Sequence, residues 1–272
     1  MKQENSVIRL PNGLKHQARK RFGQNFLHDQ QIIERIIKVI SPSQENHIVE
    51  IGPGHGALTK PLFESGADLD CIEIDKDLAE FIDNQFVNHS RVRVYQSDIL
   101  KFDLSILSNK DRNLRVVGNL PYNISTPVIF HLLKNHELIE DMTFMLQLEV
   151  IQRMASSVGQ KNYGRLSLMT QYYCKVEHLF NVPSSSFIPK PKVVSAIVRL
   201  TPHQTFPVKV IDPNCLQIVI RTAFNQRRKT LKNSLKAIMP TSALDKLPID
   251  ASLRPESLSL KDYAMISDAI SG

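Results

Sequence analysis

The sequence predicts an α/β protein with a doubly wound, mostly parallel sheet, followed by a small all-helical domain. Short apolar runs alternate with amphipathic segments through the first two-thirds of the chain, which is the pattern of repeated β-α units. The pattern becomes wholly helical after a proline-marked linker. With 272 residues, 42% of them hydrophobic, the chain can bury a sizeable core. We place the boundary near 203–212 and assign 1–205 to the sheet domain and 206–272 to the helical one.

The predicted strands are short apolar runs bounded by polar or turn-forming residues. Five belong to the β-α repeat, and two follow it on either side of a proline-rich polar loop. The strands are expected at residues 47–51, 69–74, 92–95, 114–117, 142–147, 177–182 and 193–200.

The predicted helices carry apolar residues at helical spacing between residues that start and stop helices. The first is the clearest, because Asp29 can cap it, isoleucines recur from 32 to 40, and Pro42 stops it. The other helices are expected at about residues 57–65, 76–88, 127–134, 165–173, 214–223, 227–239 and 259–270.

The positive charge is concentrated in two segments. The net charge is +7, yet residues 1–21 carry a local +5 and residues 221–236 a local +6, so the remainder is net −4. Two basic segments on an otherwise acidic protein favour contact with a nucleic-acid backbone over two solvated basic faces. Neither segment has the bulky apolar face of a membrane-binding helix. The candidate phosphate contacts in the second segment are Arg221, Arg227, Arg228, Lys229 and Lys232.

Within this second segment, the spacing predicts a helix with one basic edge. Arg228, Lys232 and Lys236 recur every four residues, beside an apolar stripe that includes Leu231 and Leu235. One edge of such a helix can pack against the protein while the other meets phosphate groups.

Cysteine, histidine and hydropathy patterns narrow the class further. The three cysteines lie far apart and the nine histidines are scattered, which predicts reduced thiols and no bound metal. No run approaches the ~18 apolar residues of a membrane span, and the polar, basic start is not typical of a secretory signal. We therefore expect a cytoplasmic protein without membrane contact, and a monomer by default.

A glycine-rich loop at residues 52–56 joins the strand at 47–51 to its helix. Glycine lets the backbone approach a ligand closely, because no Cβ stands in the way. Gly52, Gly54 and Ala57 also fit a dinucleotide pattern, and Glu73 lies 21 residues after Gly52, where an NAD ribose ligand would be. The loop alone predicts an adenosine-containing cofactor without choosing which one.

Three further features favour S-adenosylmethionine (SAM). Gly56 opens the helix one residue earlier than an NAD fingerprint requires. Asp98 follows the third strand, where a carboxylate can accept a hydrogen bond from an adenine amine. The fourth strand ends at the same edge of the sheet, in residues 119–122. Taken singly, Glu73 and Asp98 can also be solvated acids at strand ends.

Residues 119–122, Asn-Leu-Pro-Tyr, suit the binding of a flat base that carries an amine. The Asn119 amide oxygen and a nearby backbone carbonyl can both accept from an exocyclic NH2. Pro121 stiffens the turn, and Tyr122 offers a ring for stacking. A strand-end asparagine beside proline is also common in α/β turns. The prediction of base binding therefore depends largely on the neighbouring glycine-rich loop.

Together these motifs resemble the small-subunit ribosomal RNA adenine N6-dimethyltransferases. The resemblance runs from Arg19 to the C-terminal helices, and its specificity comes from the order and spacing of the motifs. One departure is Val194, where many relatives are expected to carry an acidic residue. The matching stretches are 21–27, 50–56, 73–75, 118–125, 185–191 and 223–230.

The resemblance implies a Rossmann-like SAM-dependent methyltransferase sheet and a role for each motif. On the cofactor side, the implied ligands are Gln24, Asn25 and Leu27 over SAM, Gly52 and Gly54 in the loop beneath its methionine part, Glu73 on the ribose, Asp98 on the adenine and Asn119 between cofactor and base. On the acceptor side, the implied residues are Asn119, Leu120, Pro121 and Tyr122, with Phe187 stacking on the base opposite Tyr122.

The implied reaction is the dimethylation of N6 on two adjacent adenosines in a hairpin near the 3′ end of 16S ribosomal RNA, within the assembling 30S subunit. The alternatives are an enzyme of the same fold acting on large-subunit RNA or DNA adenine, and a non-catalytic or checkpoint assembly factor. An NAD oxidoreductase is a further alternative, but it explains neither residues 119–122 nor the basic segments.

Overall fold

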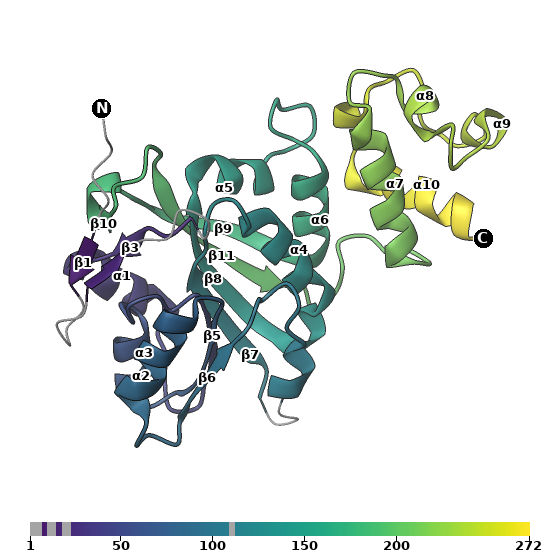
Figure 1. Cartoon of the computed structure of the whole chain (residues 1–272). Helices are drawn as coiled ribbons and strands as arrows, with labels where there is room; N and C mark the ends of the chain where they lie inside the picture. Colours follow the sequence, from purple (N-terminus) through teal and green to yellow (C-terminus); the bar gives the residue numbers. More distant parts are fainter. Residues whose placement is uncertain (1–6, 10–14, 18–22, 109–111) are drawn as a thin grey trace. The chain divides into compact units, whose positions relative to one another are not determined.

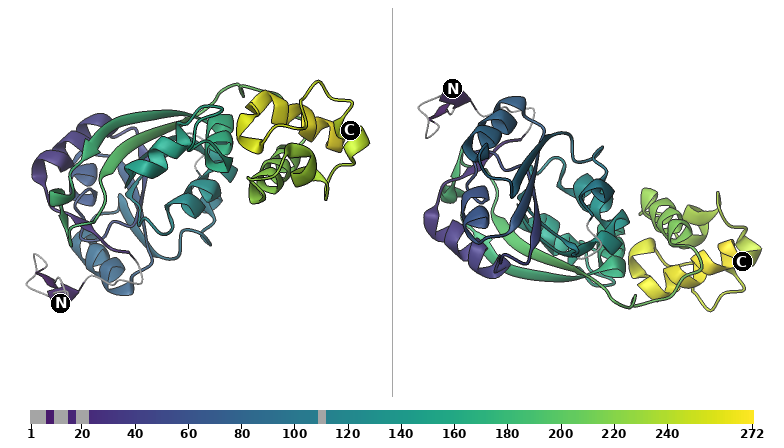
Figure 2. Two further views of the ribbon diagram at one scale, coloured as in Figure 1. Left: turned by 90° about the horizontal axis from the view of Figure 1, so that it is seen from above. Right: turned by 90° about the horizontal axis from the view of Figure 1, so that it is seen from below.

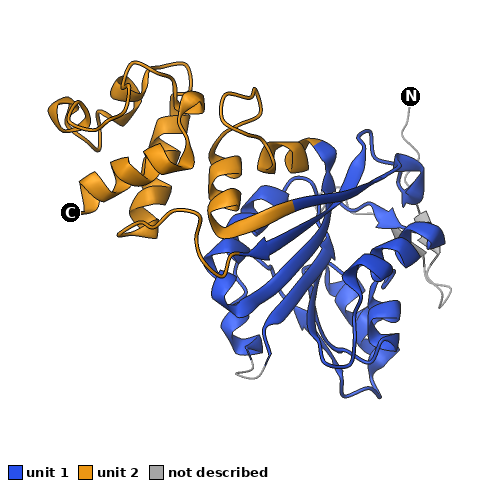
Figure 3. Ribbon diagram, turned by 180° about the vertical axis from the view of Figure 1, so that it is seen from behind, with its two compact units in different colours: residues 1–148, 177–202 blue, residues 149–176, 203–272 orange. Residues whose placement is uncertain are grey.

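The computed structural model describes residues 7–9, 15–17, 23–108 and 112–272, and the chain forms two compact units. Unit 1 comprises residues 1–148 and 177–202, and unit 2 comprises residues 149–176 and 203–272 (Figure 3). The last break falls at the start of the predicted linker. Residues 149–176 group with the helices although they precede that linker.

Unit 1 is built on a seven-stranded sheet in the order β6-β5-β4-β7-β8-β11-β9. The first five strands of this order are parallel, and β11 runs antiparallel to β8, so the predicted doubly wound, mostly parallel sheet is confirmed. The chain order reverses between β4 and β7, the point at which open sheets of this kind bind ligands. The strands are β4 (His47–Ile51), β5 (Asp68–Glu73), β6 (Val92–Gln96), β7 (Leu114–Asn119), β8 (Ile139–Gln147), β9 (Cys174–Val182) and β11 (Ser195–Pro202).

Helices cover both faces of the sheet, as right-handed crossovers on either side of the reversal require (Figures 1 and 2). On one face, the isoleucines of α1 pack with apolar side chains of α2, α3 and the sheet in a single buried cluster. The α1 helix starts as expected, because the Asp29 carboxylate accepts from the backbone N–H groups of Gln31 and Ile32. The helices of unit 1 are α1 (Gln30–Ile40), α2 (Thr59–Glu64), α3 (Lys76–Phe86) and α4 (Ser125–Lys134).

Two small antiparallel pairs lie outside the large sheet. β1 (Val7–Arg9) pairs with β2 (Lys15–Gln17), and most of the predicted basic arm around them lies outside the described residues. β3 (Phe26–Leu27) pairs with β10 (Phe187–Ile188). This second pair joins segments 160 residues apart and has only two residues per strand, which is too short for a periodic pattern in the sequence.

Unit 2 is helical, apart from the first residues of β9. Phe224 on α7 packs against Tyr163 and Tyr263, with ring centroids 6.5 and 6.0 Å away. The buried Tyr263 hydroxyl donates to the Pro255 carbonyl at 2.8 Å. In the described part of the chain, no helix is long and apolar enough to cross a membrane. The helices are α5 (Leu148–Met154, whose first residue belongs to unit 1), α6 (Arg165–Tyr173), α7 (Pro213–Asn225), α8 (Leu231–Leu235), α9 (Thr241–Leu244) and α10 (Leu260–Ser271).

Four short 3-10 turns complete the described elements. They are η2 (Leu104–Leu107), η3 (His136–Leu138), η4 (Ser184–Ser186) and η5 (Pro255–Ser257).

The predicted helix at 227–239 is wrong in extent, because only α8 forms there. The Lys229 N–H bonds to the Gln226 carbonyl, which closes a tight turn after α7. The N–H groups of Leu231 and Lys232 donate to the carbonyls of Leu253 and Ala251. A neighbouring segment thus satisfies N–H groups that a longer helix would bond internally, and Arg228 lies ahead of the helix instead of on its edge.

Candidate active site

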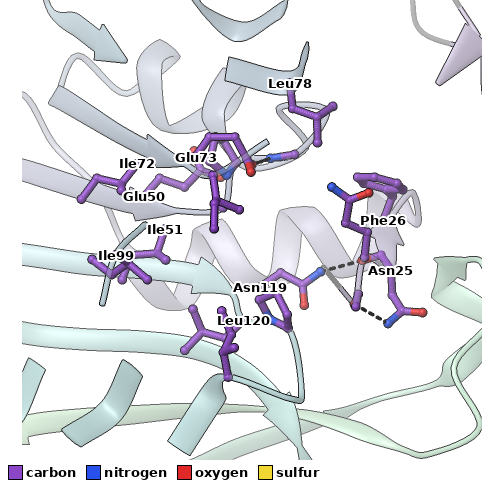
Figure 4. A pocket seen from close by; sticks show the side chains of 18 of the residues that line it. Asn25, Phe26, Glu50, Ile51, Ile72, Glu73, Leu78, Ile99, Asn119 and Leu120 are labelled. Atoms are coloured by element: carbon purple, nitrogen blue, oxygen red, sulfur yellow. Dashed lines mark hydrogen bonds between the residues drawn. The ribbon is translucent and has the colours of Figure 1, made fainter. Parts of the chain in front are cut away.

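A cavity of about 330 Å³ opens at the carboxyl ends of the parallel strands of unit 1. Its lining comes from the ends of four strands and from the segment at 23–27. Figure 4 shows Glu50 and Glu73 on one side of this cavity, Asn119 and Leu120 on another, and Asn25 with Phe26 facing them. The cavity therefore brings together the glycine loop, the strand-end acids and the Asn-Leu-Pro-Tyr turn predicted from the sequence.

The glycine loop and the Asn-Leu-Pro-Tyr turn leave the sheet side by side. Ile51, the last residue of β4, pairs in register with Gly118 on β7, so Gly52 and Asn119 follow paired residues. The strands are close at this point, because a Cβ added at Gly118 would lie 2.5 Å from the Ile51 carbonyl oxygen. The spacing between the two halves of the site is therefore fixed by the sheet.

The loop at 52–56 has a backbone that favours glycine. Gly52, Gly54 and Gly56 have φ angles of +65°, +58° and +81°, in the left-handed region that L side chains rarely adopt. A Cβ added at Gly52 meets nothing within 4 Å, so the backbone there faces open space. α2 begins at Thr59, so Gly56 lies in the turn before the helix and does not open it, which corrects the sequence prediction.

Glu73 is held at the end of β5 by two backbone N–H groups. Its carboxylate oxygens accept from Asp75 N at 2.9 Å and from Gly54 N at 3.2 Å. Burial raises the pKa of Glu73, while these two hydrogen bonds act in the opposite direction. The carboxylate is thus locked to the glycine loop and is part of the cavity wall.

Glu50 is a second carboxyl on the floor of the cavity. It is fully buried, and its Oε2 has no hydrogen-bond partner among the described residues. Burial raises the pKa of Glu50 to about 7, and the nearby charge of Glu73 acts in the same direction. The neighbouring Thr59 hydroxyl acts in the opposite direction, and the net result is a carboxyl that can change protonation near neutral pH.

Apolar side chains next to the strand-end acids also line the cavity and offer an apolar surface to a flat ring. Ile74 follows Glu73 and is 44% exposed, which is unusual for isoleucine, and Ile99 follows Asp98. Asp98 also lines the cavity, and its carboxylate accepts from Leu100 N at 3.0 Å. The apolar neighbours were not predicted as site residues, although a hydrophobic residue directly after each acid was visible in the sequence.

The segment at 23–27 lies over the cavity and fixes the Asn119 amide. Asn119 Nδ2 donates to the Asn25 backbone oxygen at 2.9 Å (Figure 4). This bond uses the amide nitrogen as donor and leaves Oδ1 as an acceptor. Gln24 Nε2 donates to Asp75 Oδ2 at 3.1 Å, so the same segment is also tied to the β5 side of the cavity.

The rest of the Asn-Leu-Pro-Tyr turn is anchored to neighbouring strands. Leu120 is fully buried, and its N–H donates to the Met145 carbonyl on β8 at 3.3 Å. The Tyr122 hydroxyl lies 2.6 Å from Ser195 Oγ, a buried hydroxyl at the start of β11. Ser195 was not predicted as a site residue, because nothing in the sequence shows that β11 lies next to β8.

Phe187, the predicted stacking residue, lies elsewhere in this structure. It is 2% exposed and packs in the cluster beneath α1, and it is not among the residues that line the cavity. The backbone of β10 pairs with β3, so Phe187 lies next to the segment at 23–27, and its side chain belongs to the same buried cluster as that of Leu27. Stacking of Phe187 on a base stays a prediction.

In unit 2, the predicted RNA contacts lie on α7, on α8 and in the turn between them. Arg221, Arg227, Arg228, Lys229 and Lys232 are all exposed. Arg227 is anchored by a hydrogen bond from Nη2 to the Lys161 carbonyl at 2.7 Å and by Glu256 at 3.6 Å. Lys232 lies 3.7 Å from Asp245, whereas Arg228 and Lys229 make no ion pair with any described residue.

The cavity fits SAM on the chemistry of its donors and acceptors. Gly52 offers backbone facing open space, Glu73 offers a carboxylate for hydroxyl groups, and Asp98 with Ile99 offers a polar and an apolar contact for an adenine. The sheet order also departs from the all-parallel dinucleotide fold, because antiparallel β11 is inserted between β8 and β9. Fold and site together define a SAM-dependent methyltransferase.

Comparison with known proteins gives the family. The family model described as ribosomal RNA adenine dimethylase matches residues 15–271, and the chain belongs to this family. Ribosomal RNA small subunit methyltransferase A of Pseudomonas syringae pv. tomato is 53% identical over 256 residues, covering 94% of this chain and 96% of the relative. The protein of the same name from Hahella chejuensis is 51% identical over 255 residues, covering 94% and 93%.

Solved structures agree with the fold. A dimethyladenosine transferase from Plasmodium falciparum superposes with a TM-score of 0.71 at 26% identity, over 88% of this chain and 94% of that one. The 23S rRNA methyltransferase ErmE gives a TM-score of 0.67 at 24% identity, over 91% of this chain and all of that one. At that identity the second likeness shows the shared fold alone.

Proposed function

We propose that this protein dimethylates N6 of two adjacent adenosines in a hairpin near the 3′ end of 16S ribosomal RNA, on the assembling small subunit in the cytoplasm. Its relatives are named as small-subunit RNA methyltransferases, which favours this substrate over large-subunit RNA or DNA. The observation that carries the proposal is the orientation of Asn119. Its amide nitrogen is tied to Asn25, so its oxygen is left as an acceptor beside the glycine loop.

The acceptor half of the site has to activate a weak nucleophile. The lone pair of an adenine amine is delocalised into the ring, so the amine reacts poorly while it stays conjugated. Asn119 Oδ1 and the Leu120 carbonyl would each accept one N6–H and hold the nitrogen with its lone pair directed at the methyl donor. Tyr122 would stack on the extruded base, since its ring lines the cavity.

The cofactor-binding half of the site is held in place by hydrogen bonds within the protein. SAM, when bound, supplies a methyl group activated by a sulfonium. Glu73 would accept from the ribose hydroxyls, Asp98 from the adenine amine, and the Gly52 backbone would lie against the methionine part. Gln24, Asn25 and Leu27 would cover the cofactor from the roof. These groups are held by hydrogen bonds within the protein, so little reorganisation is needed when the ligands bind.

RNA affinity would come from the exposed basic residues of unit 2. Arg221, Arg227, Arg228, Lys229 and Lys232 provide long cationic side chains suited to phosphate groups. Such contacts position the RNA, and the base is recognised in the cavity of unit 1.

The test is incubation of the protein with methyl-labelled SAM and, in separate reactions, undermodified small subunits, large subunits or DNA. Nucleoside analysis then locates the label. We expect N6,N6-dimethyladenosine in the small-subunit RNA only, and no incorporation into small subunits already carrying these modifications, which serve as the matched control. Label on large-subunit RNA or DNA instead would overturn the proposal.

A further inference from the structure

Tyr122 is held at its backbone and at its hydroxyl group. Its backbone carbonyl accepts from the Ser125 hydroxyl at 3.1 Å, at the start of α4. Its phenol oxygen lies 2.6 Å from Ser195 Oγ. The ring is thereby fixed in the cavity wall and not left to rotate in solvent.

The contact between Tyr122 and Ser195 joins two strands that are not neighbours in the sheet. Tyr122 follows β7, whereas Ser195 starts β11, and β8 lies between these two strands. Ser195 pairs with Gln147, the last residue of β8, and is fully buried. Because Ser195 is buried and lies on a strand that pairs with neighbours on both sides, it provides a fixed point for the far end of the tyrosine.

The pair is a neutral hydroxyl–hydroxyl bond at physiological pH. Burial raises the pKa of Tyr122 above its ordinary value near 10, so the phenol keeps its proton. No ion pair contributes, and either oxygen can donate. The bond orders the ring without placing a charge next to the base.

The two methyl transfers place different demands on this ring. An unmodified amine has two N–H groups, one for Asn119 and one for the Leu120 carbonyl. The first transfer would form an N6–methyl bond as the methyl–sulfur bond of the donor breaks, with one N6 proton released to solvent. Only one N–H then remains, so one of these hydrogen bonds is lost. Orientation of monomethyladenine then depends more on stacking, and hence on how firmly the stacking ring is held.

We propose that Ser195 is a positioning residue that fixes the Tyr122 ring and supports the second methylation more than the first. This inference rests on the proposed function. Ser195 touches no reacting atom and acts only through the tyrosine. It thereby contributes to making the dimethylated nucleoside the end product.

The test is a time course of small-subunit methylation by Ser195→Ala and Tyr122→Phe, with mono- and dimethyladenosine quantified by mass spectrometry. Each variant removes the same bond from one side and keeps the aromatic ring. Loss of one neutral hydrogen bond predicts a second transfer about fivefold slower, with the first changed less than about twofold, so monomethyladenosine accumulates. Ser65→Ala is the matched control, because it removes a hydrogen-bonded hydroxyl from the end of α2, outside the cavity.

The double variant separates this role from a general structural one. If Ser195 acts through Tyr122, the double variant behaves like either single variant. Equal slowing of both transfers, additive effects, or an unchanged product ratio would overturn the inference. Should Ser195→Ala fail to fold, Tyr122→Phe carries the test alone. A wild-type enzyme that produces no dimethyladenosine refutes the proposed function itself, whereas normal wild-type dimethylation with unaltered variant ratios refutes only the role of Ser195.

Discussion

The cavity of unit 1 and the basic segment of unit 2 at residues 221–236 hold their polar side chains in opposite ways. In the cavity, Glu73 accepts from two backbone N–H groups and Asn119 donates to a backbone oxygen. In the basic segment, Arg227 is anchored to the Lys161 backbone carbonyl, but Arg228 and Lys229 make no ion pair with any described residue, and the ion pair of Lys232 with Asp245 is 3.7 Å long and about half exposed. Bonds to backbone thus fix the cavity side chains, whereas most of the basic side chains can adapt in solvent.

This difference matches what each region has to do. Methyl transfer needs donor and acceptor aligned to within fractions of an ångström, so its side chains are fixed before the ligands bind. A phosphate backbone is a repeating charge that tolerates small displacements. Substitutions in the cavity should therefore have steep, specific effects, and substitutions in the basic segment shallow, graded ones.

The largest expected effect is at Asn119. Asn119→Ala removes the oriented acceptor, and methyl transfer should fall by about 10²–10³-fold, as for loss of a preorganised polar group in other enzymes. SAM affinity should change little, because Glu73 and the glycine loop remain intact. Tritium-methyl incorporation measures the rate of methyl transfer, and titration with SAM measures the cofactor affinity. Asn181→Ala, an exposed asparagine on β9, is the control, and undiminished turnover in Asn119→Ala would contradict the assignment.

The second-largest expected effect is a pH dependence of folding stability that comes from the buried carboxyl of Glu50. Its pKa is raised from 4.5 to about 7 in the folded chain, so the folded state holds the proton more tightly than the unfolded state. The resulting stabilisation is complete below about pH 4.5 and is lost as pH rises to about 7, a change of about 3 kcal/mol.

Urea unfolding of the wild type and Glu50→Gln across pH 4.5–8 measures this change. The difference in unfolding free energy between the two proteins should shift by about 3 kcal/mol over that range, in favour of the variant at high pH. Glu45→Gln, at an exposed position, should show no such trend. A pH-independent difference for Glu50→Gln would show that its carboxyl ionises normally.

A smaller effect is expected at Glu73. Glu73→Gln keeps the shape but loses the charge and one of two acceptor oxygens, so SAM should bind about tenfold more weakly, the cost of a charge-assisted hydrogen bond. Calorimetric titration with SAM gives the affinity directly. The exposed Glu64→Gln serves as the control, since it breaks only a surface ion pair with Lys60. An unchanged dissociation constant would remove Glu73 from the cofactor site.

The smallest effects are expected in the basic segment. Arg228→Ala and Lys229→Ala should each weaken RNA binding several-fold and lower the slope of log affinity against log salt by about 1, without loss of stability. Arg227→Ala should in addition destabilise unit 2, because it loses the bond to the Lys161 carbonyl. Filter binding over a salt series, with Lys246→Ala as control, compares them. Unaltered slopes would exclude these side chains as phosphate contacts.

The contrast between the cavity and the basic segment also appears in what the sequence could predict. The strand at 47–51 was predicted with its observed ends, because a short run rich in β-branched residues directly before a glycine loop has few alternatives. Asn119, Glu73 and Asp98 were predicted to meet because parallel strands place their carboxyl ends at one edge. Their common cavity confirms that reasoning.

The errors arise where distant segments decide the local structure. The periodic spacing of Arg228, Lys232 and Lys236 fits a helix, but carbonyls of 251–253 take the N–H groups at its start. Pairing of β3 with β10 and the bond between Tyr122 and Ser195 also join segments far apart in sequence. Local periodicity contains no information about such partners.

The close contact at Gly118 has a consequence for how this site can change over time. The backbone of β7 lies so near Ile51 that no larger residue fits, and this contact sets the separation of the two loops that leave the strands. The distance over which a methyl group travels is thus a property of the main chain. Selection can therefore change the turn after Asn119 to suit a different acceptor, while the cofactor-binding loop and its distance from the acceptor stay the same.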